Sequence, residues 1–309
     1  MLRDATMKIL MTGSTGFVGT ALCQDLQRSG HTVCRLVRPG TAAEKTRGAD
    51  GFDVNWNPAT GELGGAAVGA DAIVNLAGAS IAQGRWTAGR KKLLLSSRVD
   101  TTRALVHALS KMAARPRVLV SASGIGYYGS CGDQLLTEES PLGHDFLSRL
   151  GQEWEAEATK AESLGIRVVR ARFGIILAKH GGAFPRIARP FLWGVGGKIG
   201  DGEQWMSWVT LQDVVGIVRF ALENSPARGP LNAVPPQPVR NAEFTKVLAK
   251  TLHRPALFPA PAFALRLLLG EMADELLLAS QRAIPAQLEK LGYRFLNPDM
   301  AVALAQMFS

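Results

Sequence analysis

The feature that most constrains this 309-residue sequence is an apolar stretch that runs into a glycine-spaced turn. Residues 8–11 form the apolar stretch, and Gly13, Gly16 and Gly19 follow it before a helical pattern begins. A strand, a turn and a helix in this order are the context that a dinucleotide-binding fingerprint requires. Glycines at this spacing also occur in ordinary strand-to-helix turns. We interpret them as a phosphate cradle because strand and helix patterns keep alternating over about seventy further residues.

Each glycine in this turn has a separate expected task. Gly13 allows the tight turn after the strand, and Gly16 removes a side chain where backbone must approach a pyrophosphate. Gly19 lets the following helix pack closely. The N-terminus of that helix then directs unpaired N–H groups and a positive dipole end toward the anion.

The composition is that of a globular protein, with 47% hydrophobic and 20% charged residues. Its length suits one large domain with an elaborated second part. No apolar run approaches the ~20 residues of a membrane span, and the first residues are too few and too polar for a signal peptide. We therefore expect a cytoplasmic protein that does not associate with membranes.

The formal net charge of +9 raises the question of nucleic-acid binding. The basic residues alternate with acidic ones and form no long run, so we expect a phosphate-rich small ligand and no nucleic acid. Cys23, Cys34 and Cys131 lack metal-type spacing, and the five histidines are scattered. The sequence predicts reduced cysteines, the first two of them buried, and no metal site.

Alternating patterns predict an α/β fold of Rossmann type, a doubly wound parallel sheet with helices on both faces. Strands are expected at residues 8–12, 32–37, 52–55, 71–78, 118–123 and 167–172, and helices at 16–29, 84–109 and 146–164. We assign residues 7–172 to an NADP-binding domain. Residues 173–309 form a smaller, mostly C-terminal, substrate-facing lobe that is partly interleaved with the first domain.

The second part is richer in Gly, Pro and Trp. It should contain a strand at 205–209 and a helix at 211–223, which Thr210 and Asp213 begin with a capping box. Helices at 241–252 and 261–278 are apolar on one side and should form a covering layer. Trp193, Trp205 and Trp208 suit either an aromatic wall for a planar ligand or plain packing.

The choice of cofactor depends on the end of the second strand, ~20 residues beyond the glycines. An acid there binds the 2′-hydroxyl of NAD, whereas an arginine accommodates the 2′-phosphate of NADP. Residues 33–40 contain no acid but include Arg35 and Arg38. This favours NADP(H) over NAD(H), unless both arginines are simply solvated at the strand end.

These motifs resemble the extended short-chain dehydrogenase/reductase superfamily, which contains nucleotide-sugar epimerases and dehydratases. Within it, the sequence is similar to an atypical branch usually called epimerase family proteins, including their characteristic C-terminal domain. The segments that carry the resemblance are 12–19, 74–78, 97–98, 121–129, 154–155, 200–208, 241–244, 252–255, 285–288 and 292–295. They extend over nearly the whole chain.

The resemblance implies a set of cofactor contacts. It implies pyrophosphate contacts from Gly13, Thr15, Gly16, Phe17 and Val18, an adenosine-phosphate contact from Arg38, and ribose and nicotinamide contacts from Leu76, Ala77 and Gly78. Thr12, Gly19 and Ala122 complete the predicted cofactor site. Arg98 is similar to a cofactor-contacting position, although it could equally be a helix-surface arginine.

Most members of this superfamily carry a Tyr-x-x-x-Lys pair, in which the lysine lowers the pKa of the tyrosine that transfers the proton. This sequence lacks the pair and has Leu150 and Trp154 at the corresponding spacing. The remaining candidates for catalysis are Ser123, Tyr128, Glu138 and Glu155. Each also has a structural interpretation: the serine could bond locally to backbone, the tyrosine could serve a turn, and the carboxylates could be solvated.

We therefore expect an NADP(H)-binding oxidoreductase or epimerase-like enzyme that acts on a small carbonyl, hydroxyl or sugar-like compound. The alternative is a sensor or regulatory protein that keeps the cofactor and has lost turnover. A purely structural partner-binding module leaves the phosphate cradle unexplained. A homodimer is compatible with the sequence. The sequence does not identify the substrate.

Overall fold

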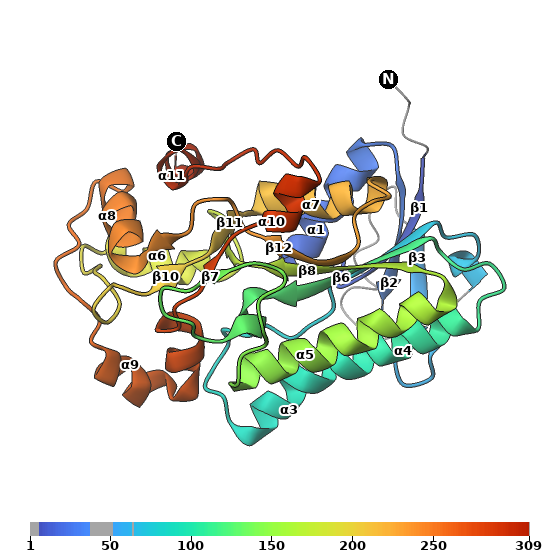
Figure 1. The fold of residues 1–309 in the computed structure, drawn as a ribbon, viewed down its shortest axis with the longest axis horizontal. Coiled ribbons are helices and arrows are strands. Elements are labelled where there is room, and N and C mark those ends of the chain that lie inside the picture. The colour runs from blue at the N-terminus through green and yellow to red at the C-terminus, as the bar shows by residue number, and fades with distance from the viewer. Residues whose placement is uncertain (1–5, 38–51, 64, 309) are drawn as a thin grey trace.

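The computed structural model describes residues 6–37, 52–63 and 65–308, and its centre is a β-sheet (Figure 1). Within these residues the sheet has eight strands in the order β12-β8-β6-β5-β1-β2-β3-β4. Its strands are β1 (Lys8–Thr12), β2 (Thr32–Val37), β3 (Phe52–Asn57), β4 (Glu62–Leu63), β5 (Ala72–Asn75), β6 (Val118–Gly124), β8 (Arg167–Phe173) and β12 (Gly229–Ala233). All neighbours pair in parallel except β3 and β4. The predicted doubly wound parallel sheet is confirmed.

Helices cover both faces of this sheet. In Figure 1, α1 (Phe17–Arg28) and α7 (Leu211–Glu223) lie above it, and α4 (Val99–Ser110) and α5 (Phe146–Thr159) lie below it. Strand β1 is apolar at successive positions because Ile9 packs with α1 and α7, whereas Leu10 packs with α4. Each such fully buried side chain stabilises the fold by roughly 1.5–3 kcal/mol. Cys23 and Cys34 are buried in these two layers, as expected.

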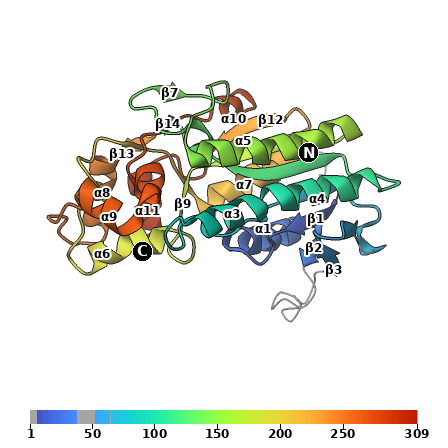
Figure 2. The ribbon, with the colours of Figure 1, turned by 90° about the horizontal axis from the view of Figure 1, so that it is seen from below.

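The remaining elements build a second lobe and its connections, seen on the left of Figure 1 and from below in Figure 2. The helices are α3 (Ala88–Ser96), α6 (Phe184–Leu192), α8 (Asn241–Thr251), α9 (Ala262–Leu269), α10 (Ala286–Lys290) and α11 (Met300–Phe308). The short strands are β7 (Leu135–Leu136), β9 (Ile175–Leu177), β10 (Trp205–Met206), β11 (Trp208–Thr210), β13 (Val239–Arg240) and β14 (Arg282–Ala283). Phe184, Trp208 and Phe244 centre the lobe's own core.

Short irregular helices connect several of these elements. They are the 3₁₀ helices Gly65–Ala67, Ile125–Tyr128 and Lys160–Leu164 and a π-helix, Ala273–Leu277. Residues 125–128, directly after β6, thus form a 3₁₀ turn. No helix of the described residues is both long enough and apolar enough to cross a membrane.

The expected helix at 84–109 is divided into α3 and α4, so a single helix is wrong. The division is at Ser97 and Arg98, whose side chains bind the turn that follows β5. The Ser97 hydroxyl accepts a hydrogen bond from the Ala79 N–H at 3.1 Å, and the Arg98 guanidinium donates to the Ala79 carbonyl at 2.9 Å. These long-range bonds keep Arg98 out of ideal helical geometry, with φ −111° and ψ −62°.

The expected strand at 205–209 is also divided, at Ser207. The Ser207 hydroxyl donates to the Gln281 carbonyl at 2.7 Å and accepts from the Ala283 N–H at 2.9 Å. By contrast, helix α7 has its predicted bounds, and the Thr210 hydroxyl accepts from the Asp213 N–H at 3.1 Å as the capping box requires.

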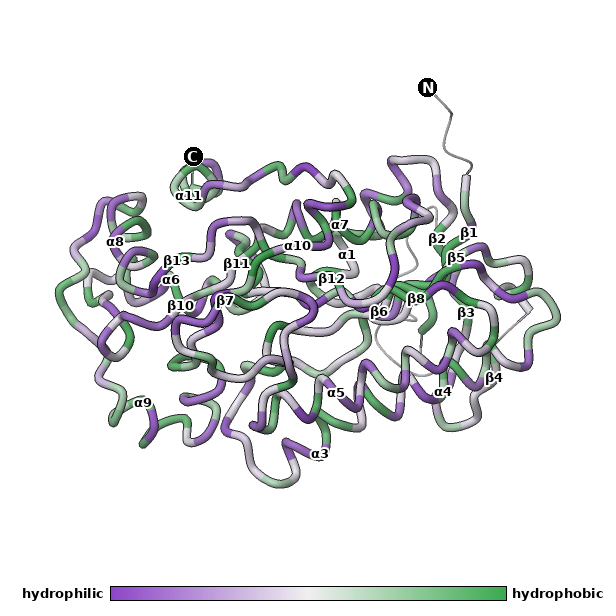
Figure 3. The backbone as a smooth tube through the Cα atoms, viewed as in Figure 1, coloured by the Kyte–Doolittle hydropathy of each residue, from purple (hydrophilic) through white to green (hydrophobic). Residues whose placement is uncertain are grey.

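The expected covering helix at 261–278 is wrong in two respects. Helix α9 ends before Gly270, which has φ +63°. A separate π-helix follows at residues 273–277. Helix α9 buries none of its residues fully, and Phe263, Leu267 and Leu268 are exposed. In Figure 3, α9 is coloured mainly hydrophobic and lies at the edge of the second lobe. Apolar periodicity alone does not distinguish an apolar face that is covered from one that stays open.

Candidate functional site

The glycine turn after β1 is packed too tightly for side chains. A Cβ atom on Gly13, which has φ +68°, would lie 2.6 Å from the Leu76 carbonyl carbon, and one on Gly19 would lie 2.1 Å from the Gly13 oxygen. The Gly16 N–H closes the turn by donating to the Gly13 carbonyl at 3.0 Å. The tight turn predicted at Gly13 and the close packing predicted at Gly19 agree with this geometry. Their contact with a pyrophosphate stays a prediction.

The N-terminus of α1 opens directly from this turn. Its N-cap is Gly16, which has no side chain to satisfy the first backbone N–H groups, and the first turn carries no acidic residue. Thr15 and Gly16 are exposed, whereas Phe17 and Val18 are half-buried. Unpaired N–H groups at the positive end of a helix dipole suit an anionic ligand.

A second wall of the candidate site lies at the carboxyl end of β5, held by buried polar side chains. The Thr12 hydroxyl donates to Asn75 Oδ1 at 2.7 Å and accepts from the Ala77 N–H at 3.3 Å. Asn75 in turn donates to Thr102 Oγ1 at 2.8 Å and to Ser121 Oγ at 3.2 Å. Segment 76–78 is therefore fixed beside Gly13, with Gly78 exposed.

Arg98 lies under this second wall. Its side chain is buried, and its guanidinium lies 5.3 Å from the Trp154 ring and about 3 Å from the place of a Cβ on Gly78. Burial, with a contribution from Arg90, lowers the pKa of Arg98 to about 10. A helix-surface arginine is therefore the wrong interpretation, and the predicted cofactor contact remains open to test.

The two arginines that favoured NADP(H) have different positions. Arg35 makes a double hydrogen bond to Asp53 of β3, at 2.7 and 2.8 Å. Arg38 lies outside the described residues. The prediction of a 2′-phosphate contact therefore rests on Arg38 and stays a prediction.

Ser123, at the carboxyl end of β6, begins a buried polar network. Its hydroxyl donates to Glu155 Oε1 at 2.7 Å. The same carboxylate receives two hydrogen bonds from Arg172, at 2.7 and 2.8 Å, and both charged side chains are almost completely buried. A bidentate arginine–carboxylate pair of this kind holds both partners in one geometry. Ala122, the neighbouring residue in β6, is buried among apolar side chains.

Tyr128 and Glu138 continue this network. The Tyr128 hydroxyl accepts from Arg172 at 2.8 Å and donates to Asn232 Oδ1 at 2.6 Å, and burial raises the pKa of Tyr128 to about 12. Glu138 Oε1 accepts from the Asn232 N–H at 2.9 Å, while its other carboxylate oxygen is buried without a hydrogen-bond partner. Burial raises the pKa of Glu138 as well.

The four candidate catalytic residues, Glu155 among them, thus share one network, together with Arg172 and Asn232. Sequence reasoning missed Arg172 and Asn232. Arg172 carries a signal that could have identified it, because it follows the apolar Ala171 near the end of a predicted sheet strand, where a buried charge requires a partner. Asn232 lies in β12, which was not predicted, and its neighbours in the network are about a hundred residues distant in sequence.

The helix face that would carry the missing Tyr-x-x-x-Lys pair is apolar. Leu150 and Trp154 are both buried and pack in the same cluster as Trp86, and the Trp154 indole donates to Thr102 Oγ1 at 3.0 Å. No ionisable group occupies either of these two positions.

The tryptophans of the second lobe occupy unlike environments. Trp208 is a core residue, whereas Trp193 is exposed and lies 4.5 Å from the Arg189 guanidinium. Trp205 lies 4.7 Å from the guanidinium of Arg240 and 4.5 Å from that of Arg282. Plain packing is the correct interpretation for Trp208.

A contact that the sequence did not predict joins the two lobes at the glycine turn. A Cβ on Gly181 or Gly182, both at positive φ, would lie 2.4 or 2.8 Å from the Phe17 ring. The segment between β9 and α6 therefore packs directly on the first turn of α1.

The sequence matches two protein-family models and several related proteins. Residues 9–233 match the NAD dependent epimerase/dehydratase family, and residues 260–307 match a domain of unknown function, DUF1731. An epimerase family protein of Mycobacterium leprae is 39% identical over 96% of this chain and 94% of its own length. The epimerase family protein YfhF of Bacillus subtilis is 38% identical over 98% of both chains.

Solved structures agree with these matches. The human epimerase family protein SDR39U1, crystallised with NADPH, has a TM-score of 0.86 at 32% identity and covers 98% of this chain and 99% of its own. A UDP-glucuronic acid 4-epimerase from Bacillus cereus has a TM-score of 0.77 at 18% identity over 98% of both chains, which shows a shared fold. The predicted resemblance is confirmed: this chain belongs to the NAD dependent epimerase/dehydratase family, in the branch of epimerase family proteins that carry a DUF1731 domain.

Proposed function

We propose that this protein binds NADP(H) and acts as an oxidoreductase or epimerase-like enzyme on a small carbonyl, hydroxyl or sugar-like compound. The observation that carries this proposal is the close-packed glycine turn, which opens on the uncapped N-terminus of α1 beside residues 76–78. The NADPH in the human relative supports the same cofactor here. We expect the ligands to be small molecules rather than nucleic acids or membranes, in the cytoplasm.

The nicotinamide, when bound, supplies the hydride chemistry, and the protein supplies binding and orientation. Ser123 is our candidate for the group that polarises a substrate oxygen, because it lies near the carboxyl end of β6 and its hydroxyl is oriented by Glu155. Tyr128 is a weaker candidate for proton transfer, since its hydroxyl is already bonded on both sides and its pKa is raised. Glu138 lies further along the same network, where its carboxylate accepts a hydrogen bond from the backbone N–H of Asn232.

A specific observation also favours a second function, a cofactor-binding sensor without turnover. Leu150 and Trp154 fill the positions of the missing acid–base pair with buried apolar groups. Such a protein would bind the dinucleotide and present a different protein surface when bound, without oxidising the cofactor.

Titration with NADPH and NADH tests both functions. Cofactor fluorescence measures binding, and absorbance then measures cofactor oxidation with a panel of carbonyl compounds. Binding with oxidation supports the enzyme, and binding without oxidation across the panel supports the sensor. If neither nucleotide binds, both proposals fail. In the enzyme, Ser123→Ala should abolish oxidation, and an unchanged rate would remove Ser123 from the site.

The preference for NADP(H) predicts the behaviour of Arg38→Asp. Loss of a charge-assisted contact with the 2′-phosphate should weaken NADPH binding about tenfold or more and leave NADH binding nearly unchanged. Arg115→Asp is the matched control, because Arg115 is exposed and precedes the amino end of β6, whereas the glycine turn follows the carboxyl end of the parallel strand β1. Equal weakening of both nucleotides would contradict the assignment.

A further inference from the structure

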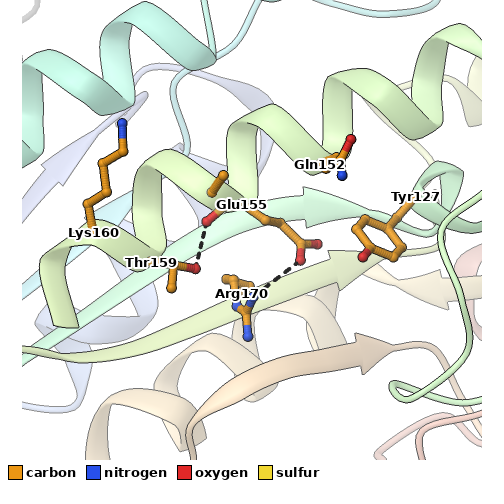
Figure 4. A pocket seen from close by; sticks show the side chains of 7 residues that line it. Tyr127, Gln152, Glu155, Thr159, Lys160 and Arg170 are labelled. Atoms are coloured by element: carbon orange, nitrogen blue, oxygen red, sulfur yellow. Dashed lines mark hydrogen bonds and ion pairs between the residues drawn. The ribbon is translucent and has the colours of Figure 1, made fainter. Parts of the chain in front are cut away.

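A pocket of about 400 Å³ lies between α5 and β8, shown in Figure 4. Gln152 and Thr159 of α5, Arg170 of β8 and Tyr127 line it, together with Lys160 directly after α5, whose ammonium points away from Arg170 in Figure 4. It shares none of the predicted cofactor contacts. Glu155 is the one lining residue that also belongs to the network of Ser123.

The charges around this pocket do not balance. The Glu155 carboxylate already accepts two hydrogen bonds from Arg172 and one from Ser123. Arg170 Nη1 lies 3.7 Å from Glu155 Oε2, which is beyond hydrogen-bond length, although it still counts as an ion pair. One carboxylate therefore faces two guanidinium groups, which leaves the pocket with an excess of positive charge.

Arg170 is also incompletely hydrogen-bonded. Its Nε atom is buried and has no hydrogen-bond partner, while its side chain is 21% exposed at the pocket. A charged guanidinium with incompletely paired donors gains free energy from an added acceptor, and the exposed part of the Arg170 side chain is accessible to a ligand oxygen. The planar guanidinium fork matches the two oxygens of a carboxylate or phosphate group.

Lys160 is a second cation among the lining residues of the pocket. Its side chain is 61% exposed, and its ammonium pairs with Glu157 at 2.8 Å. Glu157 also receives Arg103, at 2.9 Å, so the carboxylate keeps a partner if Lys160 turns toward a ligand. At the far end, the Tyr127 ring is stacked 3.6 Å from the Arg172 guanidinium and is thereby held as a rigid wall.

We propose that this pocket is a second ligand site, which binds a small anion through its carboxylate or phosphate group on Arg170 and Lys160. The site does not depend on the bound dinucleotide. Because Arg170 and Ser123 both face Glu155, an anion on Arg170 also changes the electrostatic surroundings of Ser123.

Isothermal titration calorimetry of the full chain with inorganic phosphate, and separately with succinate, tests the site at constant ionic strength. We expect dissociation constants of about 1 mM for at least one anion, since few groups contact it. Binding of phosphate alone assigns a phosphate ligand, and binding of succinate alone assigns a carboxylate. Absence of binding for both anions at tens of millimolar overturns the proposal.

The Arg170→Gln variant should weaken the bound anion about tenfold, because it loses the charged fork. Arg117→Gln is the control and should bind as the parent does, since Arg117 is a 76% exposed arginine at the start of the neighbouring strand, paired with Asp71. If Arg170→Gln does not fold, Lys160→Gln, a surface change, should still weaken binding severalfold. Anion binding that is the same in every variant would place the anion elsewhere, for example at the N-terminus of α1, and would refute the proposal.

Discussion

Single residues in this protein carry constraints that differ in kind, and Gly13 shows a steric one. Alanine at this position would combine a positive φ with a Cβ 2.6 Å from the Leu76 backbone. We expect Gly13→Ala to lower the free energy of unfolding by about 2 kcal/mol or more, and to abolish dinucleotide binding. Urea unfolding measures the first effect. Gly89→Ala is the control, because a Cβ there meets open space in α3 and should not destabilise the fold.

Glu275 shows an electrostatic constraint. Its carboxylate accepts from the backbone N–H groups of Phe146, at 3.2 Å, and Leu147, at 2.8 Å, at the start of α5. The pKa of Glu275 is raised from 4.5 to about 7, mainly by burial and also by Asp145 and Glu271, whereas the two backbone N–H groups oppose the rise. Glu271 is itself paired with Lys91.

The sign of the resulting pH dependence follows from linkage. Between pH 4.5 and 7 the folded protein holds this proton more tightly than the unfolded chain, so Glu275 makes stability fall as the pH rises. Relative to the parent, Glu275→Gln should therefore gain about 1–2 kcal/mol between pH 5 and pH 8. Urea unfolding at both pH values measures this difference. A constant difference would show that the proton is not held as described.

The stability that a helix gains from its N-cap residue depends on how deeply that residue is buried. The Thr210 cap of α7 is buried and also accepts from Asn297 Nδ2 at 3.2 Å, whereas the Thr87 cap of α3 is exposed. Thr210→Ala should cost about 2 kcal/mol of unfolding free energy and Thr87→Ala no more than about 1 kcal/mol. Equal costs in urea unfolding would indicate that the cap bond alone, not its buried surroundings, sets the loss.

The elements that could be predicted from sequence are those whose cause is local. The buried strands and α7 follow from apolar runs and a cap, because these signals lie within each segment. The breaks at Arg98 and Ser207 could not be predicted, because the groups that cause them lie 19 and about 75 residues away in the chain. The open face of α9 was missed for a related reason: exposure depends on the absence of a neighbour.

The candidate site likewise has one part that could be predicted from local sequence and another that could not. Its glycine turn is local and was predicted, whereas Glu155 and Arg172 form a site only after α5 and β8 pack together. Sequence patterns name residue types at positions, and the partner that decides each role is supplied by the tertiary fold. Ser123 illustrates this, since its hydroxyl binds Glu155 and not nearby backbone.

At the scale of the whole molecule, the network through Tyr128 connects the sheet to the segments around Glu138 and Gln287. Glu138 Oε1 accepts from Gln287 N–H at 3.2 Å as well as from Asn232. Tyr128→Phe would leave Arg172 and Asn232 each without one buried hydrogen bond. We expect a loss of about 1–3 kcal/mol in urea unfolding.

Tyr127→Phe is the comparison variant for this network, because the Tyr127 ring that packs on Arg172 would be retained. It should be nearly neutral. A neutral Tyr128→Phe would contradict the view that the phenol is structurally engaged.

The position of β12 in the sheet affects how the chain folds during its synthesis. This strand lies beside β8, with Gly229 paired to Val169 and Ala233 to Phe173, although some sixty residues separate them. A nascent chain that lacks β12 leaves the backbone edge of β8, a largely buried strand, unpaired on that side. That edge stays open until the ribosome has released residues of the second lobe, so folding of the two lobes is coupled in time, and a break between them would leave an aggregation-prone half.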